Sequence, residues 1–287
     1  MHFPKYWAKG SQTGTTPDGQ SRHFQCWRWS DESEAIAATS AQEAARRIAE
    51  NAAKGEFPPN FYGYTDRPLR EQTIREIKTQ MGVFSGVLTR NSYGCIVLNT
   101  ERVMFVDIDI PNLEHASAAQ PGFFSRLFGA RSREELLEPA LKRAQVFAYS
   151  NSAWGWRAYE TRAGLRLVAT HQLFNPLNEE TKRVFDEMNA DPLYCKLCEL
   201  QKSFRARLTP KPWRCDLPNP PVRWPYETPE IEEQFNNWEA NYLSAAGGFA
   251  TCRFLRIIGN DVIHPEIQGI VNVHDELTGA ESGLPLA

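Results

Sequence analysis

The feature that most constrains this chain is an apolar run that ends in two carboxylates. Residues 103–111 have the sequence VMFVDIDIP, so four apolar residues precede Asp107 and Asp109. Strand alternation places residues i and i+2 on one face, and both carboxylates therefore point to the same side of a predicted buried strand. Carboxylate pairs suit Mg²⁺ or Mn²⁺, which predicts a metal site. The alternative is a strand end whose aspartates cap a loop or pair with arginines.

A second feature follows about 50 residues later, at residues 161–168 (TRAGLRLV). The apolar runs on either side predict a hairpin. Thr161 and Gly164 would shape the turn, Gly164 would let a phosphate approach the backbone, and Arg166 could fork onto phosphate oxygens. The alternative is an ordinary hairpin with a surface arginine.

The third feature is a basic stretch with aromatic neighbours at residues 204–214 (FRARLTPKPWR). Because the formal net charge is −3 and the pI about 6.1, any contact with nucleic acid must come from a local patch of this kind. Cationic side chains such as Arg205, Arg207 and Lys211 contact phosphates, and aromatic rings stack on bases. A solvated loop is the alternative.

In order and spacing, these three features resemble the catalytic core of the archaeo-eukaryotic primase and primase-polymerase superfamily. In that superfamily an Asp-x-Asp on a strand of an RRM-like palm binds metal, and a hairpin of the type Ser-Gly-Arg-Gly-aromatic-His-Leu follows. The resemblance covers about residues 84–215, with residues 161–167 at the hairpin.

The resemblance implies metal-dependent binding of a nucleotide or of single-stranded nucleic acid through its phosphates, and primase-like nucleotidyl transfer. It places Asp107, Asp109 and Arg166 in the catalytic site, the two aspartates holding Mg²⁺ or Mn²⁺. The residues that it places around the phosphates are Thr161, Arg162, Gly164, Arg205, Arg207 and Lys211.

Two departures from the family pattern are visible. Arg166 stands where the family has histidine, and Gln201 falls where a third acid is expected, with Glu199 the nearest carboxylate. Two-metal phosphoryl transfer needs a full acidic set. A non-catalytic module that binds nucleic acid or protein on the same palm is therefore the alternative function.

Cysteines offer a separate metal hypothesis. Cys195 and Cys198 form a Cys-x-x-Cys pair, and Cys215 follows as a further ligand for Zn²⁺. The chain would then be a zinc-stabilised protein of unrelated function. Cysteines at i and i+3 of a helix can equally be buried packing residues.

The predicted fold is a mixed α+β protein, with an RRM-like palm sheet covered by helices. We expect an N-terminal αβ extension packed on the core at residues 1–83, a palm-like core at 84–215, and a proline-rich and helical segment at 216–287.

Within these parts, capping signals predict a helix at residues 41–54 after Ser40 and another at 133–149 after Ser132. A looser pattern predicts a helix at 68–81. Residues 112–133 are expected to form a surface insertion, and residues 271–276 the charged exit of a strand.

We expect a cytoplasmic protein with no membrane partner. The first ten residues lack the apolar stretch of a signal peptide, and no run approaches the roughly 18 apolar residues of a membrane helix. Six cysteines in 287 residues are too sparse for a disulfide scaffold, which is consistent with a reducing compartment.

Overall fold

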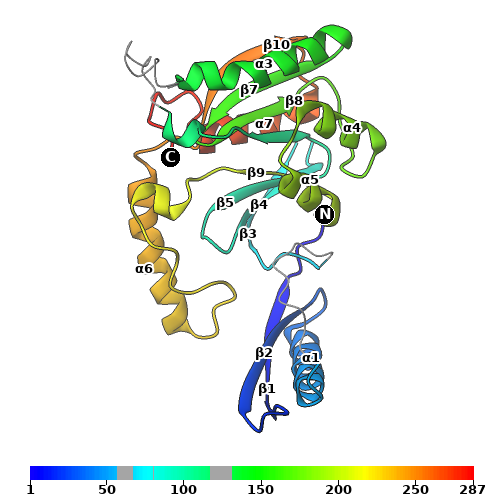
Figure 1. Ribbon diagram of the computed structural model, residues 1–287, viewed down its shortest axis with the longest axis vertical. Helices are drawn as coiled ribbons and strands as arrows, with labels where there is room; N and C mark the ends of the chain where they lie inside the picture. The colour runs from blue at the N-terminus through cyan, green and yellow to red at the C-terminus, as the bar shows by residue number, and fades with distance from the viewer. Residues whose placement is uncertain (57–66, 80, 117–130) are drawn as a thin grey trace. The chain divides into compact units, whose positions relative to one another are not determined.

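The computed structural model describes residues 1–56, 67–79, 81–116 and 131–287. They form two compact units, which Figure 1 draws with their helices and strands. The smaller unit contains residues 2–70 and 224–227, and the larger unit contains Met1 and residues 71–223 and 228–287. Most of the predicted insertion, residues 117–130, lies outside the described residues.

The smaller unit is a two-stranded hairpin with one helix. β1 (Tyr6–Thr15) pairs antiparallel with β2 (Ser21–Ser30), and α1 (Glu34–Ala53) packs on β1 and β2. The buried face of α1 consists of alanines. A Cβ at Gly10 would lie 2.1 Å from the Ala41 carbonyl oxygen, so the helix approaches the strand closely. The predicted helix is confirmed, but it begins seven residues earlier because Ser33, not Ser40, accepts the capping hydrogen bond.

The predicted helix at residues 68–81 is wrong. β3 (Gln72–Lys78) occupies most of this range and pairs antiparallel with β4 (Phe84–Arg90). The apolar residues there were only loosely periodic, and β-branched residues such as Thr73, Ile74 and Ile77 favour strands. Since β3 belongs to the same sheet as β4, the larger unit begins at Glu71 and not at residue 84.

Two four-stranded antiparallel sheets form the frame of the larger unit. The first has the order β3-β4-β5-β9, with β5 at Ile96–Thr100 and β9 at Phe204–Arg207. The second has the order β10-β7-β8-β6. Its strands are β6 (Phe105–Asp109), β7 (Gly155–Thr161), β8 (Gly164–Ala169) and β10 (Cys252–Gly259). The chain is thus a mixed α+β protein, as the sequence predicts.

Among the described residues from β6 to β9, the α-helices and strands follow the order β-α-β-β-α-α-β, close to the β-α-β-β-α-β order of ferredoxin-like folds. The helices are α3 (Arg133–Ser150), α4 (Glu179–Met188) and α5 (Pro192–Gln201). Ser132 and Glu135 form the predicted capping box of α3. The last strand, β9, pairs with β5 in the other sheet rather than with β6.

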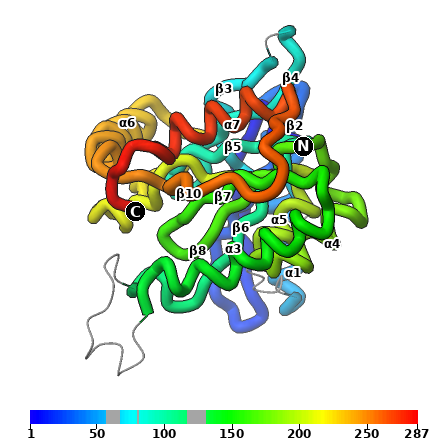
Figure 2. Tube along the Cα trace, turned by 90° about the horizontal axis from the view of Figure 1, so that it is seen from above, coloured from blue at the N-terminus to red at the C-terminus, as the bar shows by residue number. Residues whose placement is uncertain are grey.

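Helices cover both faces of the β10-β7-β8-β6 sheet, which explains why every residue of β8 is buried. α3 packs on one face, and Figures 1 and 2 show α7 (Pro265–Thr278) on the other. Residues 271–276 therefore lie inside a helix, and the predicted strand exit is wrong. The proline-rich segment leads through η2 (Pro212–Cys215) into α6 (Pro229–Ala246).

Candidate metal and phosphate site

The two aspartates of β6 lie on the sheet face that α7 covers. β6 and β8 pair antiparallel, so that Asp107 lies opposite Arg166 and Asp109 lies opposite Gly164. A Cβ at Gly164 would lie 1.8 Å from the Ile108 carbonyl oxygen, so only glycine fits against β6 at this point. The Gly164 amide also donates to the Thr161 hydroxyl at 3.0 Å, which closes the hairpin turn.

Arg166 holds Asp107 in a bidentate ion pair. Its Nε donates to Asp107 Oδ1 at 2.7 Å and its Nη2 to Oδ2 at 3.0 Å. Nη1 donates to the Arg207 carbonyl oxygen at 3.0 Å, and the side chain is 3% exposed. Burial alone would lower the pKa of Arg166, but the charge and hydrogen bonds of Asp107 outweigh it and raise that pKa. With its donors engaged inside the protein, Arg166 orients Asp107 and does not face a phosphate.

A buried histidine supports this arginine from α7. His274 Nε2 lies 3.4 Å from Arg166 Nη1, and His274 Nδ1 lies 2.8 Å from Asp275 Oδ1. Asp275 in turn accepts from Arg157 at 2.8 Å. Burial lowers the pKa of His274 despite its bond to Asp275, so the ring is neutral at pH 7. The contact was missed because α7 was predicted as a strand, on which His274 and Asp275 would point apart.

Asp109 is the exposed member of the pair and has carboxylates around it. Burial raises its pKa, and the charges of Asp191 and Asp107 raise it further. The Asp191 amide donates to the Asp107 carbonyl oxygen at 2.9 Å, and the Asp191 side chain caps α5. The Asp191-Pro192 pair is a helix-start signal that could have placed this acid at the site. Glu199, by contrast, lies on the exposed surface of α5, near Lys182.

The carboxylates of β6 suit a hard cation that also takes waters or phosphate oxygens as ligands. No three His, Cys, Asp or Glu side chains among the described residues form a group that could hold a metal ion. Mg²⁺ commonly binds one or two protein carboxylates together with waters and substrate phosphates. Asp109 and the outer lone pairs of Asp107, with Asp191 nearby, fit that mode.

Cations gather beside these carboxylates, on β9 and the segment that follows it. Burial lowers the pKa of Lys211, and the charges of Arg207 and Arg214 lower it further. Burial likewise lowers the pKa values of Arg207 and Arg214. Arg207 Nη1 is buried without a hydrogen-bond partner among the described residues, whereas Arg214 pairs with Glu114. Arg162 lies close enough to Arg214 to lower its pKa as well.

Arg205, predicted to contact phosphate, has a different role. Its Nη2 donates to both carboxylate oxygens of Glu71, at 2.7 and 3.0 Å, and both side chains are 7% exposed. This ion pair joins β9 to the residue before β3, inside the larger unit. Arg205 is therefore a structural residue.

The three cysteines of the zinc hypothesis do not form a metal-ligand group. Cys198 is fully buried in the core, and Cys215 lies on η2, where Cys95 influences its pKa. Burial raises the pKa values of Cys195 and Cys198 to about 12, which keeps both thiols protonated. A protonated thiol is a poor zinc ligand.

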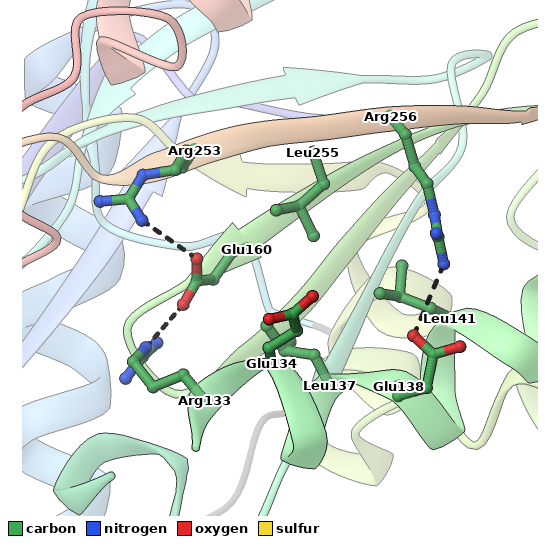
Figure 3. Close-up of a pocket in the computed structure, with 9 residues that line it drawn as sticks. All are labelled: Arg133, Glu134, Leu137, Glu138, Leu141, Glu160, Arg253, Leu255 and Arg256. Carbon is green, nitrogen blue, oxygen red and sulfur yellow. Dashed lines mark hydrogen bonds and ion pairs between the residues drawn. The ribbon is translucent and has the colours of Figure 1, made fainter. Parts of the chain in front are cut away.

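The opposite face of the same sheet carries a pocket of about 340 Å³ between α3 and β10 (Figure 3). Leucines and charged side chains line it, and each of its arginines pairs with a carboxylate of the pocket. Glu160 accepts from Arg133 at 2.6 Å and from Arg253 at 3.4 Å. Because its arginines already pair with carboxylates, this pocket offers less uncompensated charge to a ligand than the β6 site does.

Searches of family models, curated proteins and solved structures found no match to this chain. None of the helices in the described part of the chain is long and apolar enough to cross a membrane.

Proposed function

We propose that the β6 site binds the phosphates of a nucleotide, or of a nucleic-acid end, together with Mg²⁺ or Mn²⁺. The supporting observation is that incompletely compensated charges of both signs lie side by side. Asp109 has a raised pKa and Lys211 a lowered one, and Lys211 is near enough to lower the pKa of Asp109. A ligand that brings a metal cation to Asp109 and phosphate oxygens to Lys211 would compensate both charges.

The proposed roles divide between the two groups of side chains. Asp109 and Asp107 hold the cation, with Arg166 fixing the orientation of Asp107. Arg207 and Lys211 donate to the phosphate oxygens, since the buried Nη1 of Arg207 has no acceptor in the part of the chain that the structure describes. Burial strengthens such contacts because water competes less for them.

The proposed reaction is primase-like nucleotidyl transfer. The bound cation would neutralise charge that develops on the transferring phosphoryl group. Lys211 and Arg207 would position that group, which is the larger part of catalysis in phosphoryl transfer. The resemblance of residues 84–215 to primase-polymerases and the position of Asp191 beside Asp107 and Asp109 support this proposal.

Thermal denaturation tests ligand binding directly, because a ligand that binds only the folded state raises its stability. We expect Mn²⁺ with one or more nucleoside triphosphates to raise the melting temperature of the wild type and not of Asp109→Asn. Asp261→Asn, at an exposed aspartate of the same unit, is the matched control and should respond like wild type. Equal shifts in wild type and Asp109→Asn, or none in either, would contradict the proposal.

A non-catalytic binding module is the second candidate. The observation that favours it is that Arg166 already engages both oxygens of Asp107. Such a module would bind nucleic acid equally well as wild type and as Asp109→Asn, and neither would extend a primer. Template-dependent incorporation of labelled nucleotides by wild type, lost in Asp109→Asn, would exclude this candidate.

A further inference from the structure

Two large aromatic side chains lie exposed next to the cationic group. Tyr93 is 41% exposed and Trp213 is 47% exposed. Their ring centroids are 5.3 Å apart, with the ring planes at 81°. We call this pair the aromatic platform. Exposing so much aromatic surface is unfavourable in water, and exposed apolar surface of this kind often marks a binding site.

The chain holds Tyr93 in place through the turn between β4 and β5. The Asn91 side chain accepts hydrogen bonds from the amides of Tyr93 at 2.9 Å and Cys95 at 3.1 Å. Gly94 has a φ of +79°, and a Cβ there would lie 2.4 Å from the Trp238 ring. The turn is therefore packed against α6.

The segment that carries Trp213 is bound to the same turn. Cys95 Sγ donates to the Pro210 carbonyl oxygen at 3.2 Å, and the Ile96 amide donates to the Thr209 hydroxyl at 2.9 Å. From α6, the Tyr242 hydroxyl lies 2.7 Å from the Pro210 carbonyl oxygen. These contacts fix the two segments to each other, so the platform is preorganised and would lose little conformational freedom on binding.

Lys211 connects the platform to the β6 site. Its Nζ lies 5.2 Å from the centroid of the Trp213 ring, and the same ammonium group lowers the pKa of Asp109. Arg207 and Arg214 are near enough to lower the pKa of Lys211. The exposed ring of Trp213 thus lies beside the positive charge of Lys211.

From this juxtaposition we infer that Trp213 stacks on a base of single-stranded nucleic acid, that Tyr93 contacts the edge of that base, and that the phosphates of the strand pass over Lys211. The inference rests on the proposed function and adds a strand-binding surface to it. A single strand is the partner because it alone offers unpaired flat bases and closely spaced phosphates together. A double helix would keep its base faces stacked and hidden.

The test measures binding of a labelled oligothymidylate of about 12 nucleotides by fluorescence anisotropy. An abasic oligomer of the same length keeps the phosphates and lacks the bases. Both are titrated in EDTA, so that the outcome does not depend on the metal. We expect wild type to prefer the oligothymidylate and Trp213→Ala to weaken that complex about 5- to 150-fold. Binding of the abasic oligomer should stay unchanged.

Tyr149→Ala is the matched control, since Tyr149 is a 91% exposed aromatic residue on α3, and it should bind both oligomers like wild type. Trp213→Phe should restore most of the affinity, and Tyr93→Ala should lower it in the same base-dependent way. Equal loss of both oligomers in Trp213→Ala, or a wild type that does not distinguish them, would overturn the inference. The metal–triphosphate shift described above is measured without a strand, so either result can fail alone.

Discussion

Two arginine–carboxylate pairs, each with its arginine buried on a different sheet of the larger unit, have the same shortest distance and different surroundings. Arg205 meets Glu71 at 2.7 Å, and both side chains are 7% exposed. Arg166 meets Asp107 at 2.7 Å, but the Asp107 side chain is 30% exposed. The first pair is closed to any ligand. The second leaves one side of its carboxylate open, and that side adjoins Asp109.

The two arginines of β9 differ in their partners. Arg205 and Arg207 are two residues apart, and each has a buried Nη1 without a hydrogen-bond partner among the described residues, but Arg205 also pairs with the carboxylate of Glu71. A closed pair contributes to stability, whereas an unsatisfied buried cation costs stability unless a ligand provides the acceptor. Residues of one type in one motif can therefore serve opposite purposes.

Breaking the closed pair should have the largest effect on stability. Glu71→Gln leaves Arg205 buried beside a neutral amide, and we expect the free energy of unfolding to fall by about 3–5 kcal/mol. Chemical denaturation measures this. Glu50→Gln, which breaks the exposed pair with Arg46 on α1, should cost less than about 0.5 kcal/mol. A similar loss of unfolding free energy in both variants would show that burial does not make the Arg205–Glu71 pair more important for stability than the Arg46–Glu50 pair.

Breaking the half-open pair should cost less. In Asp107→Asn, water can reach part of the altered site, so we expect a loss of about 2–3 kcal/mol by the same denaturation experiment. His274→Phe, which keeps a ring and removes its acceptor beside Arg166, tests whether α7 supports the pair. A loss in Asp107→Asn as large as in Glu71→Gln would remove the distinction between the two pairs.

Asp109→Asn should change stability in the opposite direction. Because the pKa of Asp109 is raised in the folded state, its ionisation costs stability at neutral pH. The variant should therefore be more stable than wild type at pH 7, by less than about 1 kcal/mol. The difference should close as the pH falls through the folded pKa toward the usual 3.8. A variant less stable than wild type at pH 7 would contradict the repulsion from Asp191 and Asp107.

Removing metal should have the smallest effect on the fold. Since Cys195, Cys198 and Cys215 do not form a ligand group, EDTA should leave the melting temperature unchanged. Bound zinc in purified protein, with a lower melting temperature after chelation, would contradict this prediction.

The pKa of about 12 for Cys195 and Cys198 also predicts slow reaction with a thiol reagent at pH 8 in the folded state.

The sequence predicted the parts of this site that depend on local patterns. The apolar run before Asp107 predicted β6, and the turn at Thr161 and Gly164 predicted the β7–β8 hairpin. Both are short segments whose alternation or turn residues determine their structure. The pairing of β6 with β8 brings Asp107, Asp109 and Arg166 together, and their catalytic role stays a prediction.

The parts that sequence missed depend on partners distant in the chain. Arg166 was expected to face a phosphate, because nothing near it in sequence indicates that Asp107 lies opposite. Arg205 was grouped with Arg207 because Glu71 is 134 residues away. β10 went unpredicted, and residues 271–276, which were predicted to leave a strand, lie inside α7. Their type is determined by packing against the sheet rather than by local preference.

The contact between His274 and Arg166 also affects when the site can form during synthesis of the chain. The two residues are 108 positions apart, and β10 and α7 are both translated after β6 and β8. A ribosome therefore produces the acidic strand and its hairpin well before the helix that covers their inner face. Until α7 docks, Arg166 lacks one neighbour and the sheet keeps an open apolar side. The nascent chain can therefore complete this site only after α7 has been synthesised.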